Sequence, residues 1–215
     1  MMLNLMEELA LLVMQDEKGT LNLPRSDEFR YALTGALLLE LYFRKRITLT
    51  DGVIQVISAK TTGDALLDDG LKEIVALEKD KKTRYWVKNL ADNVNRKRDH
   101  LMDDLLEKGY LVKKKKGYRW SPKPAESAEK SLEHDLRAKI RNAVLLGTKV
   151  NARMASLLSL TRACGMTKDL FRDAERKTAK QMLRQVVSGE QISSKVSATA
   201  KSLIGSIHDA VKAIT

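Results

Sequence analysis

Residues 28–46 read EFRYALTGALLLELYFRKR, and this stretch decides the fold. From Ala32 to Phe43 the sequence is apolar on almost every side, broken only by Thr34, Gly35 and Glu40. A helix that is apolar all round has to be buried on all sides. A membrane-spanning helix needs about 20 apolar residues, which is more than this run contains. The stretch therefore predicts the central helix of a globular domain.

Glu40 lies in the middle of this apolar run, where an unpaired carboxylate would be costly. Acidic side chains are rarely buried unless they are paired. We therefore expect Glu40 to bind an arginine or to cap a neighbouring helix. A catalytic carboxylate is the alternative, but no second carboxylate or histidine lies nearby in the sequence.

The composition predicts a mainly α fold with short β-hairpins, one of them wing-like. The chain has 215 residues, 43% of them hydrophobic, and only 3 prolines, which suits a helical globule with a real core. We expect one domain over residues 1–215, with the hairpins in 1–122 and a helical half in 123–215. The one cysteine, Cys164, excludes an internal disulfide and lies in an apolar helix, so it is expected to act as a small hydrophobe.

The net charge of +11 indicates an anionic partner. Nucleic acid, an acidic membrane surface and a phosphorylated headgroup all fit this charge. The first residues, MMLNLMEELA, carry acids where a signal peptide has basic residues. No segment is long and apolar enough to span a membrane. We therefore expect a cytoplasmic protein whose contact with membranes, if any, is peripheral.

Local patterns predict most of the other elements. The stretch ITLTDGVIQVI (47–57) alternates in hydropathy around Asp51-Gly52, which indicates a β-hairpin. Asn4, Ser26 or Asp27, and Thr62-Gly63-Asp64 are expected to cap helices, whereas EKDKKTR is expected to be a solvated connection. Predicted helices cover 3–14, 62–77, a segment from Tyr85 with a break near Asp92-Asn93, and then 127–146, 152–164, 168–187 and 194–214.

Residues 95–120 are typical of a winged-helix unit, in which a helix precedes a hairpin with a basic tip. The helix is expected to end at Gly109, before strands at 110–112 and 118–120. Lys113 to Lys116 between them could grip a phosphate backbone. Charged hairpin turns are also common as edge protection. The preceding helix carries several acids, which would repel DNA, so nucleic acid is the weaker hypothesis; these are Asp99, Asp103, Asp104 and Glu107.

Arg98 is the most informative cation. It falls on the same helical stripe as Val94 and Leu101. An arginine on a buried stripe needs a partner. That partner is either a carboxylate, such as Glu40 or an aspartate of another helix, or a phosphate that accepts the planar guanidinium fork. The sequence leaves both interpretations open.

Sequence signals for catalysis are poor, so we expect neither an enzyme nor a bound cofactor. The 3 histidines, His100, His134 and His208, lie in separate helices without metal-ligand spacing. We find no phosphate-binding loop, dinucleotide fingerprint, nucleophile elbow or paired cysteine motif. No catalytic and no metal-binding residues are therefore assigned.

Several stretches, in this order, resemble the Golgi phosphoprotein 3 family. They are LNLMEELALLVMQDEKG, LTGALLLELYFRKRITL, TGDALLDDGLKEI, and LMDDLLEKGYL with the hairpin that follows it. They extend from about Leu3 to Trp120, and the helical remainder fits in length and character. Eukaryotic members are phosphoinositide-binding Golgi adaptors, and the family has bacterial relatives. The resemblance implies a divergent, mostly helical member whose basic face binds phosphatidylinositol 4-phosphate without catalysis.

The resemblance also implies positions for a headgroup site. The family has two arginines spaced three apart before LLEKG, and this chain has Asn95 and Arg98 there. A further family arginine precedes the glycine of the central helix, where this chain has Thr34. The family tryptophan that inserts into the membrane belongs to the loop before that helix. Here the loop contains Leu23 and Pro24 as membrane-contacting candidates, and Arg25 as a replacement for the missing charge.

The hairpin at 112–120 is similar to the one that mediates self-association in the family. Val112, Tyr118 and Trp120 are therefore candidate contacts of a homo-oligomer. The leading hypothesis is a peripheral protein that binds anionic membrane lipids, at the Golgi cytosolic face if the chain is eukaryotic. The alternatives are a winged-helix nucleic-acid binder that uses the Lys113–Lys116 tip, or an adaptor that gathers protein partners without lipid.

Overall fold

A computed structural model describes residues 3–13, 26–96, 98–113, 120–122 and 132–214. At residues 95, 96, 98, 112, 113 and 120–122 it describes the backbone only. The described part is mainly helical, as predicted. The helices are α1 Leu5–Val13, α2 Asp27–Phe43, α3 Ala65–Ala76, α4 Thr83–Asn89, α5 Ala91–Arg96, α6 Arg98–Glu107, α7 Leu132–Leu145, α8 Ala152–Ala163, α9 Thr167–Leu170, the 3-10 turn η2 Asp173–Glu175, α10 Arg176–Val187 and α11 Ala198–Ile214.

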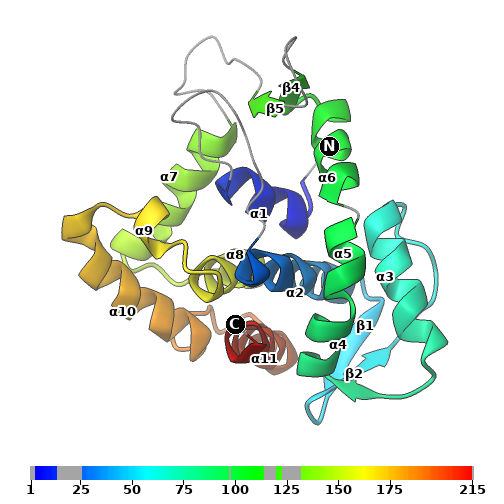
Figure 1. Ribbon diagram of the computed structural model, residues 1–215. Helices are drawn as coiled ribbons and strands as arrows, with labels where there is room; N and C mark the ends of the chain where they lie inside the picture. Colours follow the sequence, from blue (N-terminus) through cyan, green and yellow to red (C-terminus); the bar gives the residue numbers. More distant parts are fainter. Residues whose placement is uncertain (1–2, 14–25, 97, 114–119, 123–131, 215) are drawn as a thin grey trace.

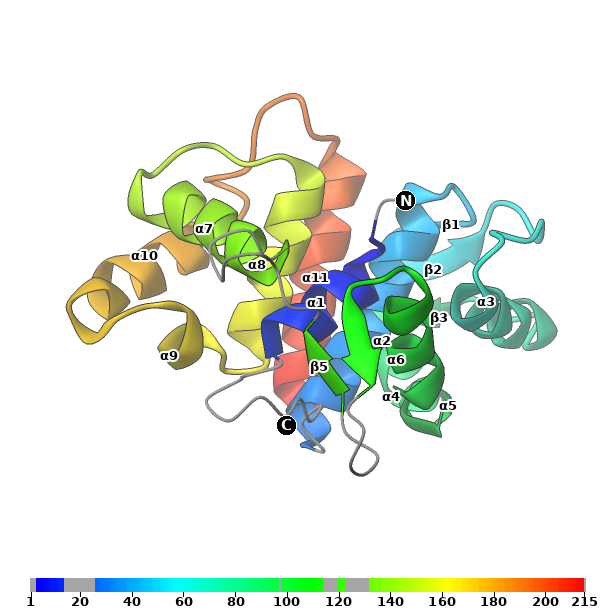
Figure 2. The same ribbon diagram turned by 90° about the horizontal axis from the view of Figure 1, so that it is seen from above.

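Helix α2 lies at the centre of the molecule, as its sequence predicts. It contacts α1, α3, α4, α5, α8 and α11, and in both ribbon views these helices surround it (Figures 1 and 2). Every residue from Tyr31 to Leu41 is buried. The Ser26 hydroxyl accepts a hydrogen bond from the Phe29 amide at 3.3 Å, so the predicted N-cap is confirmed. The helix ends at Phe43, and Lys45 follows with a positive φ of 55°.

Gly35 lets two other helices approach α2 closely. A Cβ atom added at this position would lie 2.7 Å from the Ile207 side chain of α11 and 2.9 Å from the Leu160 side chain of α8. Both of those side chains are fully buried. The glycine therefore sets the distance between the three central helices, which are shown together in Figure 2.

The hairpin predicted at 47–57 is confirmed. Strand β1 (Ile47–Thr50) pairs antiparallel with β2 (Val53–Val56), and the turn residues Asp51 and Gly52 have φ of 51° and 78°. Positive φ at both central positions is the geometry that matches strand twist in a two-residue turn. A third strand, β3 (Lys81–Lys82), pairs with β2. It lies in EKDKKTR, so the prediction of a solvated connection there was wrong at this point. Two lysines carry no strand periodicity, and their pairing depends on the neighbouring strand.

The second hairpin is also present, one to two residues later than predicted. Helix α6 ends at Glu107, and Gly109 follows with a φ of 76°. Strand β4 (Leu111–Lys113) then pairs antiparallel with β5 (Trp120–Pro122). The tip between them, with Tyr118, lies outside the described residues. The break predicted near Asp92-Asn93 is found slightly earlier, at Leu90, which caps α4 before α5 begins at Ala91.

The C-terminal half differs from prediction in one helix. The stretch predicted as one helix at 168–187 is α9, η2 and α10, because the chain is extended at Phe171, with φ of −128° and ψ of 136°. Phe171 is buried, so the break places an aromatic ring in the core. Arg141 of α7 stabilises the break, because it donates to the Leu170 carbonyl at 3.2 Å and pairs with Glu175.

Candidate functional site

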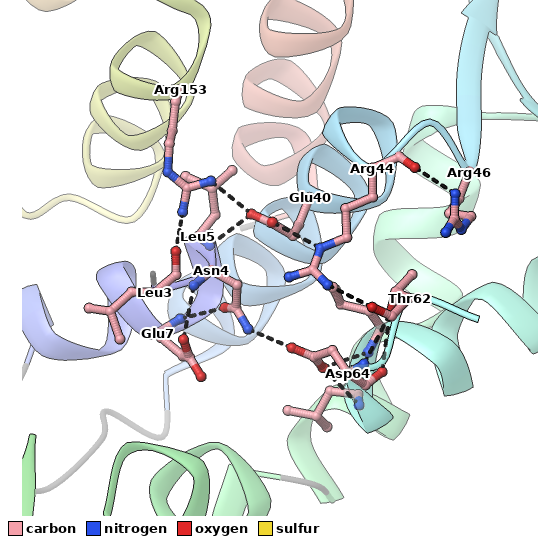
Figure 3. A network of polar contacts seen from close by, with 12 residues as sticks. Leu3, Asn4, Leu5, Glu7, Glu40, Arg44, Arg46, Thr62, Asp64 and Arg153 are labelled. Carbon is pink, nitrogen blue, oxygen red and sulfur yellow. Dashed lines mark hydrogen bonds and ion pairs between the residues drawn. The ribbon is translucent and has the colours of Figure 1, made fainter. Parts of the chain in front are cut away.

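A polar network surrounds the N-terminus of α1 and links it to α2, α3 and α8 (Figure 3). Glu40 is at its centre and is 5% exposed. One of its carboxylate oxygens accepts from the Arg44 Nε at 3.1 Å. The other accepts from the Leu5 amide and from Arg153 of α8, each at 3.1 Å. The prediction that Glu40 binds an arginine or caps a neighbouring helix is therefore confirmed, and it does both.

The same network contains the predicted caps at Asn4 and Asp64. The Asn4 side chain accepts from the Glu7 amide, and Glu7 accepts from the Asn4 amide, both at 2.9 Å. Asn4 also donates to Asp64 at 2.8 Å, and Asp64 caps α3. Lys108, which directly follows α6, pairs with the fully buried Glu7 carboxylate. These carboxylates serve as caps and ion-pair partners, so this cluster is structural.

Glu8 is an acid of this region whose ion pair does not fully offset the loss of water on burial. It pairs with Arg153 at 3.2 Å. Burial nevertheless raises the pKa of the Glu8 carboxyl, because the loss of water outweighs the attraction of Arg153. The nearby Glu40 and Glu7 add to the increase. Ionised Glu8 is therefore a mild source of instability in the folded chain.

A second polar cluster lies where the first half of α2 meets α5. The Arg30 guanidinium donates to Asp92 of α5 at 2.8 Å and pairs with Asp27 of its own helix at 2.9 Å. It also donates to the Tyr31 hydroxyl at 3.2 Å, with its central carbon 4.9 Å from the Tyr31 ring centre. The Arg30 side chain is 23% exposed, whereas Asp92 and Asp27 are 74% and 68% exposed. A largely fixed cation is thus covered by two carboxylates that face water.

An open depression of about 600 Å³ adjoins this cluster, and Asp92 is one of its lining residues. Helix α4 supplies the others: Arg84, Tyr85, Lys88 and Asn89. Arg84 donates to the Ala213 carbonyl at 3.1 Å, and Lys88 is exposed. The depression therefore has two cations on its α4 side and the Asp92–Arg30 pair at its α5 side. This arrangement is suited to an anion.

The comparisons with known proteins decide the family. The sequence model of Golgi phosphoprotein 3 (GPP34) matches residues 5–203, which is most of the chain. The chain belongs to the Golgi phosphoprotein 3 family.

Curated relatives agree with this family assignment. Vacuolar protein sorting-associated protein 74 of Schizosaccharomyces pombe is 30% identical over 159 residues, which cover 64% of this chain and 47% of the relative. The protein of the same name from Eremothecium gossypii is 36% identical over 80 residues, which cover 32% of this chain and 24% of the relative. The chain thus spans about half the length of the first relative and about a quarter of the second.

The headgroup positions implied by the Golgi phosphoprotein 3 family lie in α2, α5 and α6 where the structure describes them. Asn95 lies in α5 and Arg98 begins α6, both described by backbone only. Thr34 is fully buried, and its hydroxyl donates to the Arg30 carbonyl at 3.0 Å, within its own helix. In this conformation the Thr34 side chain does not reach the surface. Leu23, Pro24 and Arg25 lie outside the described residues.

Of the three oligomer positions implied by the family, the structure describes the backbone of Val112 and Trp120. Val112 is in β4 and Trp120 is in β5, which are paired strands. The side chains of Val112 and Trp120 lie outside the part of the chain that the structure describes, and so does the whole of Tyr118. The two strands lie beyond α6, at the opposite end of this helix from α5 (Figure 1). A role in self-association stays a prediction.

The histidine and the cysteine that could be reactive, His208 and Cys164, are packed within the described part of the protein. His208 is buried, its Nδ1 lies 3.1 Å from the Ser159 carbonyl oxygen, and burial lowers the pKa of its imidazole. Burial raises the pKa of the Cys164 thiol to about 12, so Cys164 is a poor nucleophile. Within the described ranges no group of three or more potential ligands could hold a metal ion. In the same ranges no helix has both the length and the apolar character to cross a bilayer.

Sequence reasoning missed the Arg30 cluster. The spacing of Asp27 and Arg30 predicts a pair on one helix face. Nothing local predicts Asp92, which is 62 residues from Arg30 in the chain. The depression beside Asp92 likewise depends on how α4 packs next to α5.

Proposed function

We propose that this chain is a non-enzymatic peripheral membrane protein that binds anionic phospholipid headgroups through a basic face. The main support is membership of the Golgi phosphoprotein 3 family, because the match includes the whole region from α2 to α6. The net charge of +11 agrees with an anionic surface as partner. By resemblance the headgroup is phosphatidylinositol 4-phosphate, and the place of action is the cytosolic face of a membrane.

In this proposal Arg98 and Arg25 contact phosphate, and Asn95 donates a hydrogen bond. Arginine is suited to this role because its planar fork binds two oxygens of one phosphate. Leu23 and Pro24 enter the interfacial region of the bilayer. Thr34, the fourth position, is buried and bonded to the Arg30 carbonyl, so in this proposal it would not contact the lipid directly.

Vesicle flotation tests the proposal. The protein is mixed at low salt with vesicles of phosphatidylcholine alone, or with phosphatidylserine or phosphatidylinositol 4-phosphate added. We expect flotation only with the anionic vesicles, and a loss at high salt because exposed charges are screened. Equal flotation with neutral and anionic vesicles would refute lipid binding through a basic face.

Charge reversal separates a headgroup contact from a mere change of net charge. Arg98→Glu should weaken flotation while circular dichroism stays that of the parent chain. Lys139→Glu is the matched control, because Lys139 is an exposed residue of α7, on the other side of the molecule from α5 and α6 (Figure 1). If Arg98→Glu unfolds the chain, the arginine is a structural ion-pair partner. If both variants weaken flotation equally, the attraction is not local.

The paired strands β4 and β5 favour a second candidate role, in self-association. Such hairpins expose an edge to which another chain can add. Replacing Trp120 by Ser should then lower the mass measured by sedimentation velocity without changing flotation at saturating lipid. The nucleic-acid alternative is tested by a gel shift with random duplex DNA, in which a true binder shows a steep salt dependence.

A further inference from the structure

We propose that Arg162 of α8 and Arg184 of α10 form an anion site beside α11, which binds a doubly charged phosphoryl group on a small soluble molecule. Helix α10 lies on the opposite side of α11 from α4 and α5 (Figure 1). The site is therefore separate from the headgroup positions in α2, α5 and α6, and it does not depend on the proposed membrane function.

The two faces of α11 have different partners. The Ser206 hydroxyl donates to the Thr83 hydroxyl of α4 at 2.9 Å, so this face of α11 packs against α4. His208 follows about 200° further round the helix and lies on the opposite face. Its Nδ1 is 3.1 Å from the Ser159 carbonyl oxygen of α8. The surroundings of His208 are therefore formed by α8 and not by α4.

His208 positions the first cation of the site. Because Nδ1 faces a carbonyl oxygen, this nitrogen carries the proton and Nε2 is an acceptor. A guanidinium nitrogen of Arg162 lies 3.5 Å from Nε2. Burial lowers the pKa of the His208 imidazole, which favours its neutral form. The half-buried Arg162 is thus held by a neutral group that does not balance its charge.

Helix α10 brings a second arginine to the same place. A Cβ atom added at Gly205 of α11 would lie 3.6 Å from the Val187 carbonyl oxygen, so α10 and α11 are in contact there. Arg184 is one turn before Val187, and His208 is one turn after Gly205. Burial lowers the pKa of the Arg162 guanidinium, and the charge of Arg184 lowers it further. The two arginines are therefore close neighbours.

The charges of these arginines are poorly balanced. Among the residues that the structure describes, no carboxylate forms an ion pair with Arg162 or Arg184. The exposed Asp209 attracts Arg162 only from beyond ion-pair distance. Both arginines lie in the last turn of their helices, where a cation is favourable. That effect explains each cation separately, whereas an anion between the two would remove their mutual repulsion.

Two guanidiniums on different helices favour a ligand with two negative charges. A phosphate monoester carries about −1.5 to −2 charges at neutral pH and presents three acceptor oxygens, so it can accept from both arginines. A phosphodiester has a single charge and balances only one of them. The exposed Lys177 and Lys180 of α10 add positive potential, and α10 contains no acid.

The same helix favours a soluble ligand over a membrane lipid. A helix that lies in a membrane interface inserts its apolar face. The apolar residues Ala179, Leu183 and Val186 of α10 are buried, and α10 contacts α7 and α8. The exposed face of α10 is polar, so it offers no apolar anchor to a bilayer.

Calorimetry in about 0.1 M salt tests the site with glycerol 3-phosphate, a soluble monoester, and dimethyl phosphate, a diester. We expect the parent chain to prefer the monoester. Arg184→Gln should weaken monoester binding about 10-fold, as expected for a lost hydrogen bond between charged groups. Asp209→Asn should strengthen it about 2- to 5-fold, because a nearby negative charge is removed. Arg184 is exposed, so circular dichroism of its variant should match the parent chain.

Lys79→Gln is the matched control, since it removes an exposed cation that follows α3, on the other side of the molecule from α10 (Figure 1). It should leave the affinity for glycerol 3-phosphate unchanged. The NMR signals of the His208 ring locate the ligand, because Nε2 contacts Arg162. They should shift when glycerol 3-phosphate is added to the parent chain, and much less in Arg184→Gln.

The inference is wrong if the parent chain binds the two phosphates equally or not at all, or if Arg184→Gln and Lys79→Gln have the same effect. Flotation with vesicles that contain phosphatidic acid, a lipid monoester, tests the choice of a soluble ligand. Arg184→Gln should leave this flotation unchanged. If it lowers flotation and leaves the binding of glycerol 3-phosphate intact, the ligand is a lipid and the soluble assignment is overturned.

Discussion

Replacing Glu40 by Gln tests whether the buried carboxylate holds the centre of the molecule together. The substitution keeps the shape of the side chain and removes its charge. Glu40 accepts three hydrogen bonds, two from arginines and one from the Leu5 amide. The glutamine carbonyl can serve only part of this set, and its NH₂ group faces a cation.

The magnitude follows from the exposure of the partners. Hydrogen bonds to charged groups contribute about 1.5–3 kcal/mol each, and breaking a buried ion pair costs about 3–5 kcal/mol. Arg44 and Arg153 are 32% and 37% exposed, so water can partly replace the lost carboxylate. We therefore expect Glu40→Gln to lower the free energy of unfolding by about 2 kcal/mol, which corresponds to a Tm lower by about 4–8 °C in a chain of this size.

Urea unfolding followed by circular dichroism measures this change, with the slope of the transition as a check on two-state behaviour. Asp69→Asn is the control, because its pair with Lys72 is a surface contact with side chains 35% and 76% exposed. It should cost at most about 1 kcal/mol. If Glu40→Gln is no more destabilising than this control, the buried network does not stabilise the fold as argued.

Three further predictions concern packing, pH and thiol chemistry. Gly35→Ala should be about 1–3 kcal/mol less stable than Gly205→Ala, since both gain helix propensity but only the first overpacks the core, and urea unfolding of the two variants compares them directly. Burial raises the pKa of the Glu8 carboxyl above its unfolded value of 4.5. Protonated Glu8 therefore adds to the stability of the folded chain below pH 4.5, and this stability is lost as the pH rises through the folded pKa. Glu8→Gln should therefore be more stable than the parent chain at about pH 7 and lose this advantage at about pH 4; an equal difference at both pH values would contradict the shift. Cys164 is half-buried and its thiol has a pKa of about 12, so it should react with a disulfide reagent far more slowly than a free thiol at about pH 8, and labelling of the folded chain at the free-thiol rate would contradict the raised pKa.

The sequence predicted correctly those helices, caps and turns that depend on interactions between residues close together in the chain. The apolar run of α2, the Ser26 cap and the Asp51-Gly52 turn each follow from residues within a few positions of one another. Helix and hairpin patterns act over this range because side-chain periodicity and turn geometry are properties of the short chain segment. The same reasoning failed at β3, which owes its pairing to β2.

The candidate site depended more on the tertiary structure. The sequence predicted that Glu40 has an arginine or a cap, but its partner Arg153 is 113 residues away. It directed attention to Arg98 and Thr34, but it did not predict that Arg30 of α2 pairs with Asp92 of α5. Spacing along a helix places a residue on a face, but it does not say which other helix covers that face.

What the sequence determined by itself is therefore a buried central helix, its caps, its hairpins and the excess of positive charge. What only the tertiary structure decided is which charges meet. Ion pairs between distant segments form when packing of the apolar faces brings the helices together, and that packing depends on the whole core, including the space that Gly35 leaves for α8 and α11.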